Sequence, residues 1–428
     1  MAAALGVLVS CGSVKSGEEV VAASRDSKVV VAYVTSWSEV MPDPQYMTHI
    51  NYAFGHVNES FNGVKIDNEE RLRQIVDLRK QKPELKVLLS IGGWGSGRFS
   101  EMAANDEYRR AFAADCARVV KEFALDGIDI DWEYPTSSMA NISSSPDDTE
   151  NFTLLMQDIR AAIGNEKELT LATVASARYI DFKAILPSVD FVNIMAYDMA
   201  SAPKHHSALY PSGHSGDITS DGAVTAHLKA GVPPSKLVMG MPFYGRGGDG
   251  YPSFQDYNKV GNTDTQYTEK WDEVAQVPYL ADKNDTLVFG FENPRSLAIK
   301  CQYILDKDLL GGMYWDYSGD NEQGDLRRTV AENLLGKPHK AKVLVLTERG
   351  GQHGGFTDAG LRWLAAEGAK GNFSITEINN ARNITEAYLS QFSLVIQLDF
   401  PPYTWPKEAE DAFVKYIEEG HGGWIGFH

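Results

Sequence analysis

Between residues 28 and 336, short hydrophobic runs alternate with amphipathic stretches. The runs are rich in Val, Ile, Leu and aromatic residues, which is typical of buried strands; they lie at 28–34, 49–54, 86–91, 127–132, 169–174, 191–197, 237–242 and 311–314. Apolar residues at helical spacing predict helices in the gaps, most clearly at 69–81, 108–123, 149–163, 220–230, 294–305 and 326–335. This alternation predicts a parallel α/β fold, and eight strands suit a TIM (β/α)8 barrel.

Two gaps depart from the regular strand and helix alternation. The gap after the first strand is short and rich in Pro, so we expect it to be irregular. The gap between 242 and 311 is too long for one crossover and predicts a small α+β insertion at about 246–292, between strands seven and eight. Such an insertion lies at the strands' carboxyl ends, where TIM barrels build their active sites.

The alternating pattern restarts near residue 341 and predicts a second α/β unit at 341–428. Strands are expected at 341–346, 392–398 and 423–427, and helices at 357–368 and 408–419. The last strand reaches the end of the chain without a following helix. Because parallel sheets are normally covered on both faces, we expect this unit to be incomplete, as in a truncated gene product.

Acidic residues interrupt the fourth predicted strand, which reads Asp126-Gly-Ile-Asp-Ile-Asp-Trp-Glu133. Asp129, Asp131 and Glu133 are two residues apart, so a strand places all three on one face. Apolar residues separate them, which indicates that both faces of the strand are buried, as in a parallel sheet. Because clustered buried carboxylates destabilise a fold, we interpret them as catalytic rather than as a solvated edge or a cation site.

Composition and charge narrow the possible partners. The chain of 428 residues is 43% hydrophobic, as in a soluble globular protein, and carries a formal net charge of −18. This charge opposes binding to nucleic acid and anionic lipid, and it favours a neutral partner such as a sugar. Three cysteines cannot form a disulfide scaffold. Of these, Cys116 and Cys301 are predicted to be buried in helices.

The amino-terminal segment 1–27 has the pattern of an export signal followed by a flexible tether. Its apolar run ends in Leu8-Val-Ser-Cys11, which resembles the lipobox of bacterial lipoproteins, where the cysteine carries a lipid anchor. No Lys or Arg precedes the run, so we expect the true start to lie upstream. An extracytoplasmic location follows, periplasmic or at the outer membrane or cell surface. No run reaches the ~20 apolar residues of a membrane span.

The acidic strand resembles the D-G-x-D-x-D-x-E signature of glycoside hydrolase family 18, which contains chitinases and endo-β-N-acetylglucosaminidases. Further motifs of that family follow in order, at Ser90-Ile-Gly-Gly-Trp94, Met195-Ala-Tyr-Asp198, Gly240-Met-Pro-Phe-Tyr-Gly-Arg246 and Gly312-Met-Tyr-Trp315. We therefore assign 28–338 to a family 18 catalytic barrel. The segment 341–428 resembles the first half of a ThuA-like (trehalose-utilisation-like) domain, of flavodoxin-like or amidotransferase-like fold.

Glycoside cleavage needs a carboxylic acid that protonates the leaving oxygen, and Glu133 is the candidate. Family 18 is an exception among glycosidases because the substrate's own 2-acetamido oxygen acts as nucleophile. The resemblance then implies that Asp131 orients the acetamido group while sharing a proton or hydrogen bond with Asp129. It also implies that Tyr197 donates to the acetamido carbonyl and that Asp198 lies near the same group.

Further residues are expected to bind substrate. The resemblance implies that Trp315 floors the site of the scissile sugar. Other cleft candidates, for several of which a core position is the alternative, are Tyr33, Phe54, Trp94, Tyr134, Met195, Tyr244 and Arg246. Arg246 contacts sugar hydroxyls or braces the insertion through a salt bridge. We expect no cofactor and no metal, in spite of His205, His206 and His214, and we expect Asp126 to be structural.

The resemblance thus predicts a retaining hydrolase of β-1,4 linkages in chitin or chito-oligosaccharides that acts through an oxazolinium intermediate. An endo-β-N-acetylglucosaminidase acting on N-glycans is the first alternative. A non-hydrolytic chitin-binding lectin is the second, although such relatives usually lack the acid that is present here as Glu133. We expect a monomer whose partner is a glycan that contains N-acetylglucosamine, and no nucleic-acid partner.

Overall fold

The computed structural model describes residues 28–248, 250–260, 266–336, 341–347, 349, 354–371, 373–382, 384–398 and 404–427. The predicted lipid-anchor residue Cys11 and the tether lie outside these residues. Within the described part of the chain, no helix has both the length and the apolar character needed to cross a bilayer.

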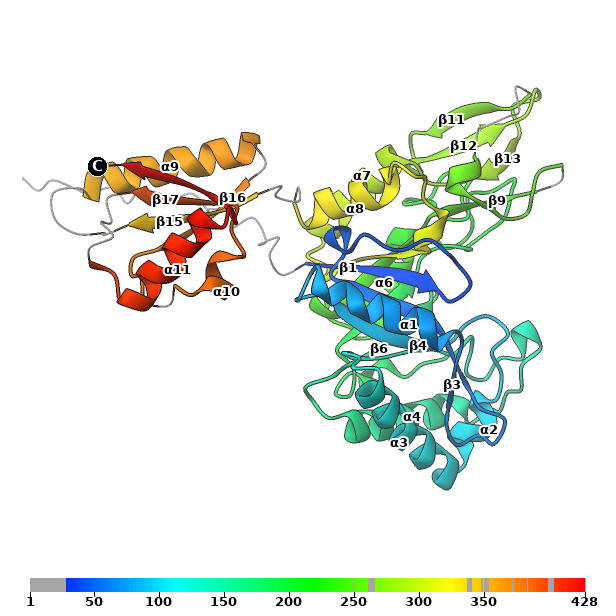
Figure 1. Ribbon diagram of the computed structural model, residues 1–428. Coiled ribbons are helices and arrows are strands. Elements are labelled where there is room, and N and C mark those ends of the chain that lie inside the picture. The colour runs from blue at the N-terminus through cyan, green and yellow to red at the C-terminus, as the bar shows by residue number, and fades with distance from the viewer. Residues whose placement is uncertain are drawn as a thin grey trace, which may run out of the picture.

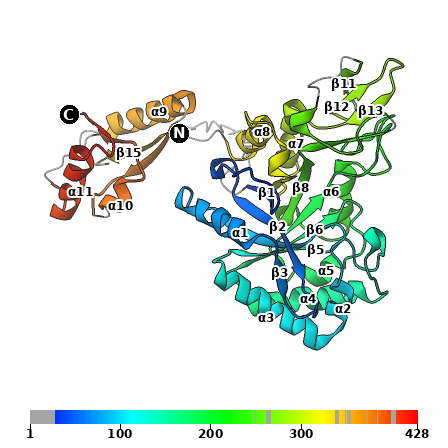
Figure 2. The same cartoon turned by 45° about the vertical axis from the view of Figure 1, so that its right-hand side comes forward.

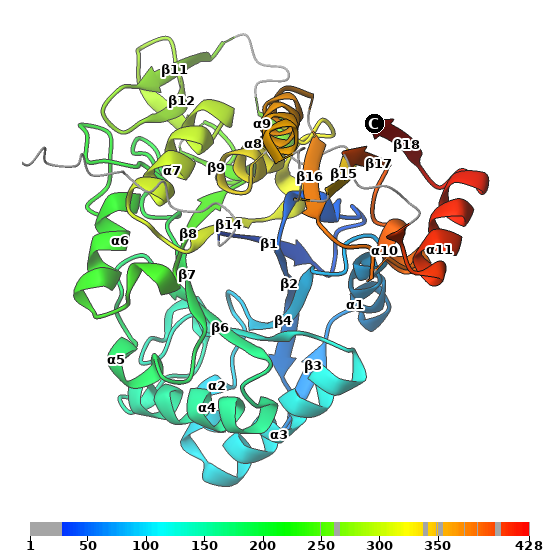
Figure 3. The same ribbon diagram turned by 90° about the vertical axis from the view of Figure 1, so that its left-hand side faces the viewer.

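Eight parallel strands form a closed barrel, seen end-on in Figure 3. Each predicted strand is present, as β1 (Val29–Thr35), β2 (His49–Val57), β4 (Lys86–Gly92), β5 (Gly127–Asp131), β6 (Glu168–Val174), β7 (Phe191–Met195), β8 (Leu237–Pro242) and β14 (Gly311–Trp315). The sheet closes because β1 pairs with both β2 and β14. The TIM barrel predicted from the alternating pattern is therefore confirmed.

Helices surround the barrel on its outer face (Figures 1 and 2). They are α1 (Glu69–Val76), α2 (Phe99–Ala104), α3 (Asp106–Glu122), α4 (Asp148–Ile163), α5 (Phe182–Ile185), α6 (Ser220–Lys229), α7 (Pro294–Asp306) and α8 (Asp325–Leu334). The main hydrophobic core lies between them and the strands. Cys116 of α3 and Cys301 of α7 are fully buried there, as predicted. The predicted helix 69–81 is shorter than expected, because a 3-10 turn (Asp77–Lys80) follows α1.

The connection between β1 and β2 is irregular, as expected, and contains a single 3-10 turn, Pro44–Tyr46. The predicted insertion between β8 and β14 forms an antiparallel sheet in the order β10-β9-β13-β12-β11. Its strands are β9 (Tyr244–Gly247), β10 (Gln255–Asp256), β11 (Thr268–Asp272), β12 (Val277–Ala281) and β13 (Leu287–Gly290). The pattern did not indicate the short β3 (Val64–Ile66), which pairs antiparallel with the last residues of β2.

A buried ion pair ties the end of the insertion to α7. Lys300 of α7 and Glu292 form a salt bridge, and both side chains are fully buried. Ser207 joins the pair, since its hydroxyl donates to Glu292 at 2.6 Å and its carbonyl accepts from the Lys300 ammonium at 2.5 Å. The loop after β7 is thereby fixed to the helix that follows the insertion.

The carboxyl-terminal unit has a parallel sheet in the order β16-β15-β17-β18. Its strands are β15 (Ala341–Thr347), β16 (Phe373–Ile378), β17 (Leu394–Leu398) and β18 (Gly423–Phe427), with helices α9 (Gly354–Gly371), α10 (Glu386–Leu389) and α11 (Lys407–Glu418). A cluster with α10 and α11 covers one face of the sheet and α9 packs on the other (Figure 1). Residues of the edge strand β18 are exposed. The pattern had not indicated β16 and α10.

Candidate active site

A cavity of about 730 Å³ opens at the carboxyl ends of the barrel strands. All the predicted site residues except Asp129 line it, namely Tyr33, Phe54, Trp94, Asp131, Glu133, Tyr134, Met195, Tyr197, Asp198, Tyr244, Arg246 and Trp315. They come from the ends of different strands and from the insertion. The barrel topology thus gathers residues that are far apart in the sequence.

Alternation along β5 turns its acids toward the barrel interior. Ile128, Ile130 and Trp132 belong to the core between the sheet and the helices, where the Trp132 ring stacks on Phe99 at a centroid distance of 5.3 Å. Asp129 and Asp131 therefore project to the opposite face, inside the barrel. The strand ends at Asp131, and Glu133 follows it at the mouth of the cavity.

Asp129 lies beneath the cavity and is fully buried. Its carboxylate accepts hydrogen bonds from four side chains on four different strands, Thr170 (2.6 Å), Ser90 (2.8 Å), Tyr33 (2.9 Å) and Asn193 (3.3 Å). Burial raises the pKa of Asp129, and these donors oppose that rise. The described contacts include no hydrogen bond between Asp129 and Asp131. The expected sharing between them is therefore not seen, because polar neighbours occupy both oxygens of Asp129.

Asp131 and Glu133 are the acids that face the cavity. Burial raises the pKa of Asp131 well above its ordinary value, and the charges of Glu133 and Asp129 add to this effect. Within the described residues, the buried Oδ1 of Asp131 has no hydrogen-bond partner. Burial raises the pKa of Glu133 to about 7, with a further rise from the charge of Asp198, while a hydrogen bond from Tyr134 lowers it. Glu133 thus retains a proton near neutral pH and can act as an acid.

Asp198 follows β7 and forms a bidentate salt bridge with Arg246 of β9. The Arg246 Nε and Nη2 atoms lie 2.6 Å from Asp198 Oδ1 and Oδ2 respectively, and His206 Nδ1 lies 3.5 Å from Oδ1. Burial would raise the pKa of Asp198, but these partners hold it well below its usual range, so the carboxylate stays charged. Arg246 therefore joins the insertion to the barrel through a salt bridge with Asp198. This is one of the two roles expected for Arg246.

Tyr197 places its phenol in the cavity next to these acids. Its only described hydrogen-bond partner is the Met313 sulfur, at 3.9 Å, so the hydroxyl can turn to a bound ligand. Burial raises the pKa of Tyr197 well above its ordinary value, and the charges of Asp131 and Glu133 raise it further. The phenol therefore remains a donor at any physiological pH. The Tyr244 ring packs edge-on against it at 6.0 Å.

Aromatic rings form one wall of the cavity. Trp315 stacks on Phe54 at a centroid distance of 5.5 Å and lies 5.7 Å from Tyr33 and 6.5 Å from Trp37. Trp37 and Trp94 are 64% and 61% exposed, which is unusual for rings of this size. Flat, exposed rings beside polar groups suit a ligand with both C–H faces and hydroxyls, as in a sugar.

The sequence interpretation missed some residues that line the cavity, among them Trp37, Met139, Arg178, Tyr179 and Phe254. Trp37 lies only two residues past the end of β1, a position that could have suggested it. Phe254 belongs to the insertion and stacks on Tyr244 at 4.6 Å. Neither its spacing nor its neighbours in the sequence indicate that contact.

Asp126 and His205, which lie outside the cavity lining, have partners within the fold. Asp126 accepts from Arg79 and from the amide of Val87 at the opposite end of β5, away from the cavity, which matches the structural role expected for it. His205 Nε2 lies 3.1 Å from an oxygen of Asp272 in the insertion. In the described part of the chain, no three His, Cys, Asp or Glu side chains are arranged to hold a metal ion.

Similarity to known proteins agrees with this geometry. The chain is 30% identical over 409 residues to chitinase A1 of Niallia circulans, covering 71% of this chain and 58% of that protein. It is 31% identical to chitotriosidase-1 of Mus musculus, covering 69% and 74% of the two chains. The solved structure of a glycoside hydrolase family 18 N-acetylglucosaminidase from Paenibacillus barengoltzii matches with a TM-score of 0.66 and 32% identity, over 72% of this chain and 99% of that chain.

Two families match different parts of the chain. Residues 342–428 match the family ThuA, Trehalose utilisation, which agrees with the resemblance of the second α/β unit. Residues 29–320, which span the whole barrel and the insertion, match the family Glycosyl hydrolases family 18. With its closed barrel, its acidic fourth strand and these relatives, the chain belongs to glycosyl hydrolase family 18.

Proposed function

We propose that this chain is a chitinase that cleaves β-1,4 linkages between N-acetylglucosamine units and retains the anomeric configuration. The observation that carries the proposal is the pair of acids facing the cavity. Glu133 has a pKa of about 7, and Asp131 presents a buried oxygen without a partner in the described residues. A proton donor and an acceptor for an acetamido N–H thus lie two residues apart, at the end of β5 and just after it.

The proposed reaction begins when Glu133 protonates the glycosidic oxygen as the bond to the anomeric carbon breaks. The substrate's acetamido oxygen bonds to that carbon and gives an oxazolinium, as in other family 18 enzymes. Asp131 accepts the acetamido N–H and opposes the positive charge, while Tyr197 donates to the acetamido oxygen and aligns it. Ionised Glu133 then takes a proton from water, whose oxygen attacks the anomeric carbon as the bond between that carbon and the acetamido oxygen breaks. The product is a sugar with its anomeric configuration retained.

Asp129 and Asp198 would act through their neighbours. The donors around Asp129 fix its position below Asp131, where its charge raises the pKa of Asp131. Asp198 is held by Arg246, and its charge raises the pKa of Glu133. Trp315 would floor the site, with Tyr33, Phe54, Trp94, Tyr134, Met195, Tyr244 and Arg246 lining the remainder.

Chitin is favoured over N-glycans because chitinases predominate among the relatives, although the chain spans only 58% of the chitinase A1 length. The test compares wild type with Glu133→Gln on a tetramer of N-acetylglucosamine and on a high-mannose glycopeptide. We expect wild type to cleave the tetramer with retention, and Glu133→Gln to bind it without turnover. Cleavage of the glycopeptide alone would favour an endo-β-N-acetylglucosaminidase, and binding without turnover by wild type would favour a lectin.

The proposal extends to the cellular location of the protein. The lipobox resemblance at Cys11 supports an extracytoplasmic lipoprotein, where a polymer too large to enter the cell can be reached. Membrane fractionation of cells that express the chain, compared with a Cys11→Ser variant, tests this. We expect the variant to leave the membrane fraction.

A further inference from the structure

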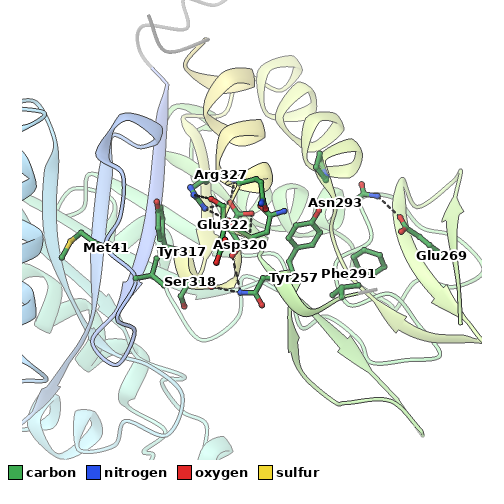
Figure 4. Close-up of a pocket in the computed structure, with 16 residues that line it drawn as sticks. Met41, Tyr257, Glu269, Phe291, Asn293, Tyr317, Ser318, Asp320, Glu322 and Arg327 are labelled. Atoms are coloured by element: carbon green, nitrogen blue, oxygen red, sulfur yellow. Dashed lines mark hydrogen bonds and ion pairs between the residues drawn. The ribbon is translucent and has the colours of Figure 1, made fainter. Parts of the chain in front are cut away.

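A second cavity, of about 1020 Å³, lies beside the catalytic one, between the insertion and the segment that joins β14 to α8 (Figure 4). Two segments border both cavities. Trp37 and Trp315 line the catalytic cavity, whereas Met41, Tyr317 and Ser318 line the second. The two spaces are therefore neighbours at the barrel mouth, and a long substrate held in one passes close to the other.

The walls of the second cavity combine rings with amide and hydroxyl groups. Its aromatic residues are Tyr257, which is half-buried, and Phe291 and Tyr317, each only 3% exposed, and its neutral polar residues are Asn293, Ser318 and Gln323. The volume is at the upper end of the range of about 300–1000 Å³ that is usual for small-molecule sites. Rings beside neutral donors and acceptors suit a ligand that carries hydroxyl and amide groups on an apolar frame.

Charge in the second cavity excludes an anionic ligand. Its only described cation, Arg327, is neutralised by Asp320, whose Oδ2 lies 3.1 Å from Arg327 Nη1. The guanidinium also lies over the Tyr317 ring at 5.1 Å. Glu269 and Glu322 add negative charge to the wall, which repels phosphate and carboxylate groups. Neutral and cationic ligands remain, and the neutral amide and hydroxyl groups of the wall favour a neutral one.

Several polar groups of this cavity lack a protein partner in the described residues. The Nε of Arg327 is buried and makes no hydrogen bond. The Tyr257 hydroxyl and the Gln323 amide also make none with the described chain. Burial raises the pKa of Tyr257 to about 12, so its hydroxyl remains a donor. The Arg327 Nε is closed off from the cavity, whereas Tyr257 is half-buried and Gln323 is exposed, so these two side chains can turn to the hydroxyl and acetamido oxygens of a ligand.

We propose that this cavity is a second, non-catalytic saccharide site that holds a neutral oligomer of N-acetylglucosamine beside the catalytic cleft. The choice of sugar rests on the proposed function, whereas the neutral polyhydroxylated class rests on the wall itself. A polymer chain anchored here keeps its remainder close to Glu133, which raises the effective concentration of cleavable linkages at the cleft.

The test is calorimetric titration of the full chain, in a Glu133→Gln background, with the trimer of N-acetylglucosamine. We expect two classes of site. Adding Tyr257→Phe and Gln323→Ala removes two hydrogen bonds and weakens one class by about 25-fold, since each bond contributes about fivefold. Adding Trp315→Ala instead weakens the other class.

The matched control changes Tyr108→Phe and Gln302→Ala, which lie on the surface of α3 and α7 and border neither cavity. The control pair should change neither class. A single class of site, or equal binding by the Tyr257 and Gln323 double variant and its parent, would overturn the second site. Failure of the wild-type chain to cleave the tetramer would overturn the proposed function instead. The two outcomes are distinguishable because the titrations measure binding, which does not depend on turnover.

Discussion

Replacing Glu133 with Gln removes a cavity acid whose pKa is raised to about 7. The pKa of Glu133 is raised from 4.5 to about 7. Since one pKa unit corresponds to about 1.4 kcal/mol, ionising Glu133 costs the folded chain about 3 kcal/mol more than the unfolded chain. Solvent screening at the cavity mouth makes this value an upper limit. Gln has almost the same shape and cannot ionise, so the substitution isolates that cost.

The sign of the effect follows from the raised pKa. A carboxylic acid that holds its proton more tightly when folded contributes stability below its unfolded pKa of 4.5, and that contribution is lost as pH rises through about 7. The Glu133→Gln variant does not lose this stability as the pH rises. Its free energy of unfolding relative to wild type should therefore grow from pH 4.5 to about 7, by up to about 3 kcal/mol, and stay constant at higher pH.

Urea unfolding of both chains across this pH range, followed by tryptophan fluorescence, measures the difference. A difference that stays constant from pH 4.5 to above 7 would refute the reasoning, because Glu133 would then titrate alike in the folded and unfolded chains. The same pKa governs catalysis. For wild type, kcat/KM should fall about tenfold per pH unit above about 7, where the acid is ionised. An active Glu133→Gln variant would refute the assignment of the acid.

Three further substitutions test the neighbouring groups. Asp131→Asn should lower kcat by about 100-fold to 1000-fold, because it removes the charge that opposes the oxazolinium; steady-state kinetics on the tetramer decides. Asp198→Asn should move the basic limb of kcat/KM to lower pH, since the charge of Asp198 raises the pKa of Glu133; a move to higher pH contradicts this. Lys300→Met should lower the free energy of unfolding by about 3–5 kcal/mol, because it leaves Glu292 charged and without its cationic partner. Urea unfolding should show that adding Glu292→Met restores most of the lost free energy of unfolding.

Much of the barrel could be predicted because each of its strands carries a local signal. Buried parallel strands are continuous apolar runs, and the helices between them show spacings that fit one buried face. The weakest signals belonged to short elements such as β3, α10 and β16. Three or four residues do not carry a period, and the exposure of β16 on one edge dilutes its apolar pattern.

The candidate site could be predicted where chemistry and strand position coincide. The period of two along β5 already placed Asp129, Asp131 and Glu133 on one face. The missed residues Trp37 and Phe254 lie in irregular segments, where no period relates a residue to the cleft. Their place depends on how the β1 loop and the insertion fold over the barrel mouth.

The closed barrel and its eight strands could be predicted from local periodicity, and residue chemistry singled out Asp129, Asp131 and Glu133 as the candidate acids. The groups that those acids contact, in contrast, depend on how the chain folds. Four strands converge on Asp129 and occupy its oxygens, which leaves Asp131 without a described partner at Oδ1. Arg246 reaches Asp198 from a strand 48 positions away in the chain. Contacts of this kind depend on how distant segments close around one cavity, and burial in that cavity sets the pKa of Glu133.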